Sequence, residues 1–139
     1  MLLLDTNVIS ELRKISLGRA DLNVTRWASR VEPGDLYISV ITVHELEVGV
    51  LRVERRDARQ GVALRVWLED RVLRTFAGRI LAVNTAIAMR AAQLQVPNPH
   101  SVQDGLIAAT ALVHGITVVT RNVGDFAGTG VAVFNPWTI

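Results

Sequence analysis

Short apolar runs alternate with longer segments of helical periodicity along the chain, and this alternation constrains the fold more than any other feature. The expected strands are the apolar runs at residues 2–4, 36–40, 79–83, 116–120 and 131–134. The expected helices lie between them, at residues 7–14, 19–31, 41–56, 58–76, 84–95 and 101–115. Because parallel strands need helical crossovers between them, the pattern predicts an α/β fold with a mainly parallel central sheet flanked by helices.

Local signals sharpen these boundaries. Ser39 or Thr42 is expected to cap the helix that starts near residue 41, and Gly115 is expected to follow the last helix. The stretches EPGD (32–35) and RNVGDF (121–126) are expected to be turns.

Length and composition favour one globular domain over residues 1–139, since no linker or low-complexity tract divides the chain. The chain has no cysteine, which excludes disulfides, cysteine-based zinc sites and cysteine nucleophiles. Asp5 interrupts the N-terminal apolar run, and no apolar stretch is long enough to span a bilayer. We therefore expect a cytoplasmic protein without a membrane partner.

The basic residues are unusual in kind rather than in number. Lys14 is the only lysine, so 14 of the 15 basic residues are arginine, while the net charge is only +2. Arginine binds phosphate with a bidentate fork, but a genome rich in arginine codons explains the same bias. Charge alone is therefore weak evidence for a nucleic-acid partner.

Acidic side chains follow two of the expected strands directly. Asp5 comes after the run at residues 2–4, and Asn122 and Asp125 come after the run at 116–120. Ligands of open α/β sheets bind beyond the carboxyl ends of the strands, so both acidic turns fall on the functional edge of the sheet. Each acid also has an ordinary explanation, since Asp5 could cap a strand end and Asp125 could simply shape a turn.

Two further acids lie on expected helices. Asp104 shares a helical face with apolar residues in the first turn of a very apolar helix, where a cap is the simpler explanation. Glu45 shares its face with Ile41 and Val48, and it could be a partly solvated helix residue.

The four acids together indicate more than each one alone. Two carboxylates about 5 Å apart repel by about 3 kcal/mol at an effective dielectric of about 20. A converging cluster is tolerable if a cation is bound or if some groups stay protonated. All-oxygen ligands suit Mg²⁺ or Mn²⁺, so the cluster favours metal-assisted phosphodiester hydrolysis.

Four motifs carry a family resemblance: LLLDTNVISEL, SVITVHELEVGV, QDGLIAATALVHGITVVTRNVGDF and the closing FNPW. Together they resemble PIN-domain proteins, and in particular the VapC-type toxins of type II toxin–antitoxin pairs in the FitB-like branch. The resemblance extends over nearly the whole chain and implies a three-layer PIN-like fold.

The resemblance also implies an activity, a cofactor and a set of site residues. It implies an endoribonuclease that depends on Mg²⁺ or Mn²⁺. The acidic quartet that would ligate the metal and catalyse the reaction maps to Asp5, Glu45, Asp104 and Asp125. The implied supporting groups are Thr6, Asn7, Thr120 and Asn122.

The implied partners are an RNA substrate and a VapB-like antitoxin with a DNA-binding half. The resemblance further implies a homodimer, which pairs again in higher-order complexes with the antitoxin. Trp27, Trp67 and Trp137 favour self-association too, because one small core cannot bury all three.

Other function classes fit less well. An aspartyl-phosphate phosphatase or receiver-type domain needs a downstream lysine, but the only lysine is Lys14 in the first helix. A Ser–His–Asp hydrolase is disfavoured because His44, His100 and His114 have no G-x-S-x-G partner. A non-catalytic PIN-type module that binds RNA or an antitoxin stays open, although the presence of all four acids argues against it.

Overall fold

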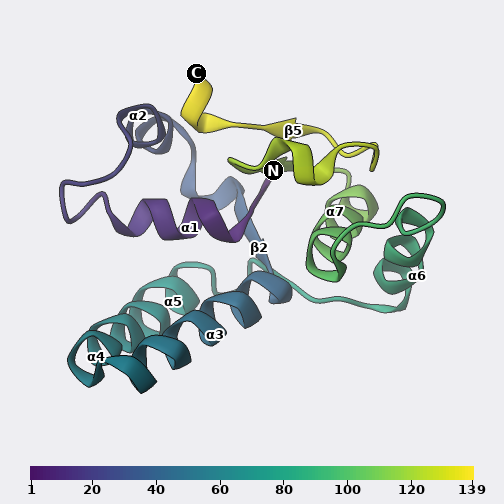
Figure 1. Ribbon diagram of the computed structural model, residues 1–139. Coiled ribbons are helices and arrows are strands. Elements are labelled where there is room, and N and C mark those ends of the chain that lie inside the picture. The colour runs from purple at the N-terminus through teal and green to yellow at the C-terminus, as the bar shows by residue number, and fades with distance from the viewer.

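The computed structural model describes residues 1–139 and contains one five-stranded sheet in the order β3-β2-β1-β4-β5 (Figure 1). The strands are β1 (Leu2–Leu4), β2 (Leu36–Ser39), β3 (Ile80–Leu81), β4 (Thr117–Val119) and β5 (Val133–Phe134). Every neighbouring pair is parallel. The predicted α/β fold with a parallel central sheet is therefore confirmed.

The helices lie close to the predicted positions. They are α1 (Thr6–Arg13), α2 (Leu22–Arg30), α3 (Val40–Arg56), α4 (Ala58–Val66), α5 (Leu73–Thr75), α6 (Thr85–Leu94) and α7 (Val102–His114). A side-chain oxygen of the preceding residue caps all of them except α5. Ser39 is the cap of α3, whereas Thr42 is fully buried inside the protein. Gly115 ends α7 in the left-handed conformation, at φ 67°.

Three segments differ from the sequence prediction in detail. The expected helix at 58–76 runs through α4 and α5 but contains a π-helical stretch between them, η2 (Trp67–Val72). The strand expected at 79–83 pairs only at β3. The two expected turns form short 3₁₀ helices, η1 (Pro33–Asp35) and η3 (Val123–Phe126).

Helices cover both faces of the sheet, which gives three layers. Leu4 and Val119 belong to the larger core cluster, which also takes side chains from α1, α2, α3 and η2. Leu3 and Val118 point to the other face and join the cluster built largely from α7. Helix α6 packs on α7 at the outside of this second layer, as Figure 1 shows. None of the helices combines the length and the apolar character needed to cross a bilayer.

The direction in which successive strands are added to the sheet reverses beside β1. The chain builds outward from β1 to β2 and β3 on one side, and then crosses over to add β4 and β5 on the other side. The carboxyl ends of β1 and β4 therefore lie next to each other at a topological switch point, where α/β proteins bind their ligands.

Candidate active site

Asp5 is the fixed centre of this switch point. It follows β1 directly, and its N–H donates to Val119 O of β4 at 2.9 Å. Its carboxylate Oδ1 accepts the Thr6 N–H at 2.9 Å, while Oδ2 accepts the Thr120 hydroxyl at 2.8 Å and the Asn7 amide at 3.1 Å. Burial raises the pKa of the Asp5 carboxyl, and the nearby charge of Asp104 adds to the increase, although these hydrogen bonds oppose it.

Asn7 and Thr120 connect the two sides of the switch point. The Asn7 side chain donates to Thr120 Oγ1 at 3.2 Å and accepts the Arg121 N–H at 3.1 Å. The Thr120 hydroxyl oxygen also accepts the Asn122 N–H at 3.0 Å. The segments that follow β1 and β4 are thus held in one polar network around the Asp5 carboxylate.

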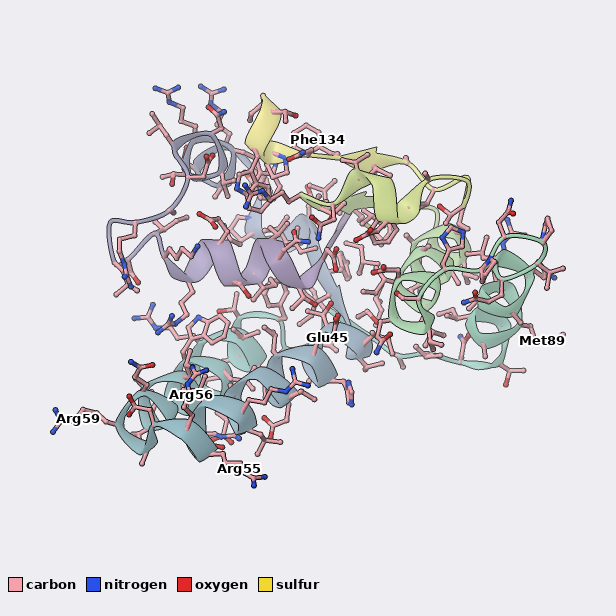
Figure 2. The ribbon with its side chains drawn as sticks, in the orientation of Figure 1. Glu45, Arg55, Arg56, Arg59, Met89 and Phe134 are labelled. Carbon is pink, nitrogen blue, oxygen red and sulfur yellow. The ribbon has the colours of Figure 1, made fainter.

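Glu45 enters the site from the second turn of α3. Figure 2 shows it near the start of that helix, where α1, α3 and α7 come together. The Thr6 hydroxyl donates to Glu45 Oε1 at 2.7 Å, which orients the carboxylate. Partial burial raises the pKa of Glu45, and the charges of Asp5 and Asp104 raise it further, against the Thr6 hydrogen bond.

Asp104 and Asp125 are held less firmly than Asp5 and Glu45. Asp104 is the third residue of α7, and its N–H is capped by Ser101 Oγ at 3.1 Å. Asp125 lies in η3, where its N–H donates to Asn122 O at 3.1 Å. Neither carboxylate has a hydrogen-bond partner within the protein, and the Asp125 side chain is exposed, so both can turn toward a ligand.

These side chains line one hollow of about 560 Å³ that contains neither a hydrophobic nor a basic residue. The ten lining residues are Asp5, Thr6, Asn7, Ser10, Glu45, Ser101, Gln103, Asp104, Asn122 and Asp125. All four predicted acids and three of the four predicted supporting groups therefore lie together. Thr120 is the exception, because it is fully buried beneath the hollow and acts only through Asp5, Asn7 and Asn122.

The sequence prediction did not include three of the lining residues. Ser10 lies one helical turn after Thr6, so the i, i+4 spacing of two small hydroxyl residues was an available signal. Ser101 and Gln103 flank Asp104 at the start of α7, where their place beside a predicted ligand was the only indication.

The donor set fits a hard divalent cation. Every acidic, hydroxyl and amide group in the hollow offers oxygen, which is what Mg²⁺ and Mn²⁺ prefer. As the side chains stand, no three of the carboxylates are grouped tightly enough to hold an ion. Burial raises the pKa values of Asp5 and Glu45 first of all, and the charge of Asp104 raises both further. A bound cation would offset both effects, and Asp104 and Asp125 have no protein partner that would keep them from it.

The fold and the hollow define an α/β protein with an all-oxygen acidic site at the switch point of a parallel sheet. The PIN-domain family model matches residues 2–130. This chain therefore belongs to the PIN-domain family, and the resemblance carried by the sequence motifs is confirmed.

Relatives with established names match over nearly the whole chain. Toxin FitB of Neisseria gonorrhoeae is 41% identical over 143 residues, covering 99% of both chains. The VapC ribonuclease Y4jK of Sinorhizobium fredii is 38% identical over 142 residues, covering 99% of this chain and 98% of the relative. The crystal structure of FitAcB from N. gonorrhoeae matches with a TM-score of 0.90 at 39% identity over 100% of both chains. The structure of FitAB bound to an IR36 DNA fragment matches with a TM-score of 0.88 at 38% identity, covering 100% of this chain and 97% of that one.

Proposed function

We propose that this PIN-domain protein is the endoribonuclease toxin of a toxin–antitoxin pair, and that it hydrolyses RNA phosphodiester bonds with the help of Mg²⁺ or Mn²⁺. The observation that carries the proposal is the hollow at the switch point, which gathers four carboxylates and no basic group. The names of the relatives, a toxin and a VapC ribonuclease, support the same activity.

Asp5 and Asp104 are the residues that would hold the metal directly. Asp5 is oriented by three hydrogen bonds, and Asp104 has no protein partner for its carboxylate, whose charge acts on both Asp5 and Glu45. Asp125 would complete a second, weaker position from the other side of the hollow. A bound divalent cation supplies a water of lowered pKa and stabilises the negative charge that develops on the phosphate.

Glu45 is the proposed proton acceptor or water-mediated ligand. Its raised pKa makes it a better base than an ordinary glutamate near neutral pH. The Thr6 hydroxyl holds Oε1, so the other oxygen remains available to a water molecule or a substrate hydroxyl. Asn7, Thr120 and Asn122 then act as supporting groups that keep Asp5 in place.

The protein is proposed to act as a single PIN domain over residues 1–139 that forms a homodimer. We propose that its activity is held in check by a VapB-like antitoxin with a DNA-binding half, and that dimers pair again in the complex. The matching structure of FitAB bound to an IR36 DNA fragment supports a DNA-binding complex of this kind.

A circular single-stranded RNA tests the activity, because only an endonuclease can open it. The purified toxin, freed of antitoxin, should linearise the circle with Mg²⁺ or Mn²⁺ and should leave it intact in EDTA. Asp5→Asn should be inactive under all of these conditions. A well-folded wild-type protein that binds the antitoxin but opens no RNA with either metal would support the non-catalytic module instead.

A further inference from the structure

The proposed substrate is a polyanion, yet no basic residue lines the acidic hollow. RNA-binding proteins normally supply arginine or lysine along the path of the phosphates, because neutralising them releases bound counterions. Arg121 lies between Thr120 and Asn122 in the sequence, and Asn122 lines the hollow. Its side chain is exposed, so it is available at the rim.

The register of the sheet places this rim within reach of the site. Leu4, Val119 and Phe134 lie side by side on β1, β4 and β5. The chains that leave these strands therefore start at the same edge, with Asp5, then Thr120, then Asn135. Since neighbouring strands are about 4.8 Å apart, the end of β5 lies about 10 Å from the end of β1.

Arg121 is held at this edge by its neighbours. Its guanidinium carbon lies 5.5 Å from the ring centre of Trp137, which belongs to η4 (Pro136–Thr138) beyond β5. Its N–H donates to Asn7 Oδ1 at 3.1 Å, and the same Asn7 side chain donates to the Asp5 carboxylate. The backbone position of Arg121 is therefore tied to Asp5 through Asn7, while the Trp137 ring holds its guanidinium.

Trp137 is fixed at both ends of its backbone. Its N–H donates to Asn135 Oδ1 at 2.9 Å, and its carbonyl oxygen accepts the Asn23 amide of α2 at 2.8 Å. Figure 1 shows the C-terminal segment passing from β5 toward α2. An exposed cation–π pair contributes only about 0.5–1 kcal/mol, so this arrangement adds little to stability but holds a positive charge in one place.

We propose that Arg121 binds the RNA beside the acidic hollow, contacting a phosphate or stacking on an unpaired base, and that Trp137 is the positioning residue that holds the guanidinium there. Both modes are chemically natural for arginine, whose fork matches phosphate and whose plane stacks on bases. The proposal deepens the proposed function, and it rests on RNA being the substrate.

Binding measured without cleavage tests the proposal. The probe is a fluorescent single-stranded oligoribonucleotide in EDTA, titrated with toxin at several salt concentrations, with the RNA checked for integrity on a gel. Arg121→Ala should weaken binding about tenfold. If the contact is to a phosphate, the slope of log K against log salt should also become shallower by about 0.7. In cleavage assays with metal, KM should rise while kcat changes little.

The role of Trp137 has its own test. Trp137→Phe keeps an aromatic face and should bind nearly as the wild type does, whereas Trp137→Leu should lose several-fold in affinity. Thermal melting identifies any general loss of packing, because Trp137 also touches the larger core cluster. Equal affinity for Trp137→Leu and wild type would remove Trp137 from the proposal.

The chain contains a matched control in Arg13, whose guanidinium lies 5.7 Å from the ring centre of Trp67. Arg13 is at the far end of α1, about 12 Å from Asp5 along an eight-residue helix. Arg13→Ala removes the same charge and the same kind of contact, but it should leave RNA affinity unchanged. Equal weakening by both substitutions would mean general electrostatics and would overturn the assignment.

The outcomes separate this inference from the ribonuclease proposal. If wild type cleaves RNA and Arg121→Ala binds and cleaves identically, the Arg121 contact is wrong and the activity stands. If wild type never cleaves but loses RNA affinity only on Arg121→Ala, the activity is wrong and the RNA contact stands. Loss of antitoxin binding alone on Arg121→Ala would assign the residue to that interface and refute the inference.

Discussion

The structure assigns the cap of α7 to Ser101 and not to Asp104, so replacing Asp104 by asparagine separates a metal-ligand role from the electrostatic role of an acid in the first helical turn. The Asp104 N–H is capped by Ser101 Oγ at 3.1 Å, whereas its carboxylate lines the acidic hollow without a protein partner. Asparagine keeps the size of the side chain and the capped N–H, so the start of α7 should be preserved. Only the charge in the hollow is removed.

Two opposing terms set the stability of this variant. Loss of an acid from the first turn of a helix costs about 0.3–1 kcal/mol. Against that loss, the charge of Asp104 acts on Asp5 and Glu45 and raises the pKa of both. Carboxylates about 5 Å apart repel by about 3 kcal/mol at an effective dielectric of about 20. Without metal, the melting temperature of Asp104→Asn should therefore equal or exceed that of wild type.

Activity should respond in the opposite direction. Loss of a direct metal ligand should lower the cleavage rate at least about a hundredfold, which corresponds to about 2.7 kcal/mol of transition-state stabilisation. The assay is RNA cleavage in excess Mg²⁺ or Mn²⁺, together with melting curves with and without metal. Asp70→Asn is the control, since Asp70 is an exposed helical aspartate outside the hollow. Near-wild-type cleavage by well-folded Asp104→Asn would refute the metal-ligand reasoning and leave Asp104 as an acid that interacts with the N-terminal dipole of α7.

Three further predictions concern association and pH. Sedimentation at micromolar concentration should show a homodimer, and finding only a 15.2 kDa species would exclude it. The antitoxin should place an arginine among the carboxylates of the hollow, so its complex should take up no metal there; a complex that still binds metal and cuts RNA contradicts this. Burial raises the pKa of Glu45 in the folded protein, so the protonated side chain is favoured by folding. In EDTA, the contribution of Glu45 to the free energy of unfolding is therefore present at acid pH and is lost as the pH rises through the raised pKa. Glu45→Gln keeps an acceptor for Thr6, so its stability relative to wild type should increase with pH, and a constant difference in denaturant titrations would contradict the shift.

Local rules were sufficient to place Asp5 and Asp125 at one edge of the sheet, whereas the family resemblance was needed to expect that Glu45 and Asp104 join them. Asp5 ends a strand, and Asp104 lies in a capped first helical turn. The carboxyl ends of parallel strands meet at one edge, so the alternation of elements placed Asp5 and Asp125 together. Thr110 shows the limit of local patterns, because this polar residue is fully buried, with its hydroxyl donating to Leu106 O.

The π-helical stretch η2 was not predicted, although the sequence held a signal for it. Leu64, Leu68, Val72 and Phe76 repeat at every fourth position. In a regular α-helix each such step advances about 40° beyond a full turn, so the last residue would leave the apolar face. A wider turn compensates for this drift, and Leu68, Val72 and Phe76 are all buried in the structure. The length of β3 depends instead on tertiary pairing with β2, which no local pattern encodes.

The pairing of β1 with β4 has a consequence for how the toxin is made. Asp5 donates its N–H to Val119 O, and its carboxylate accepts the hydroxyl of Thr120, which is synthesised 115 residues after it. Asp125 is synthesised after Thr120. A growing chain on the ribosome therefore carries Asp5 and Glu45 before the residues that complete the site around them have been made. The acidic hollow can assemble only after Asp125 has been made, so the ribosomal RNA is not exposed to a finished active site while the segments before it are being translated.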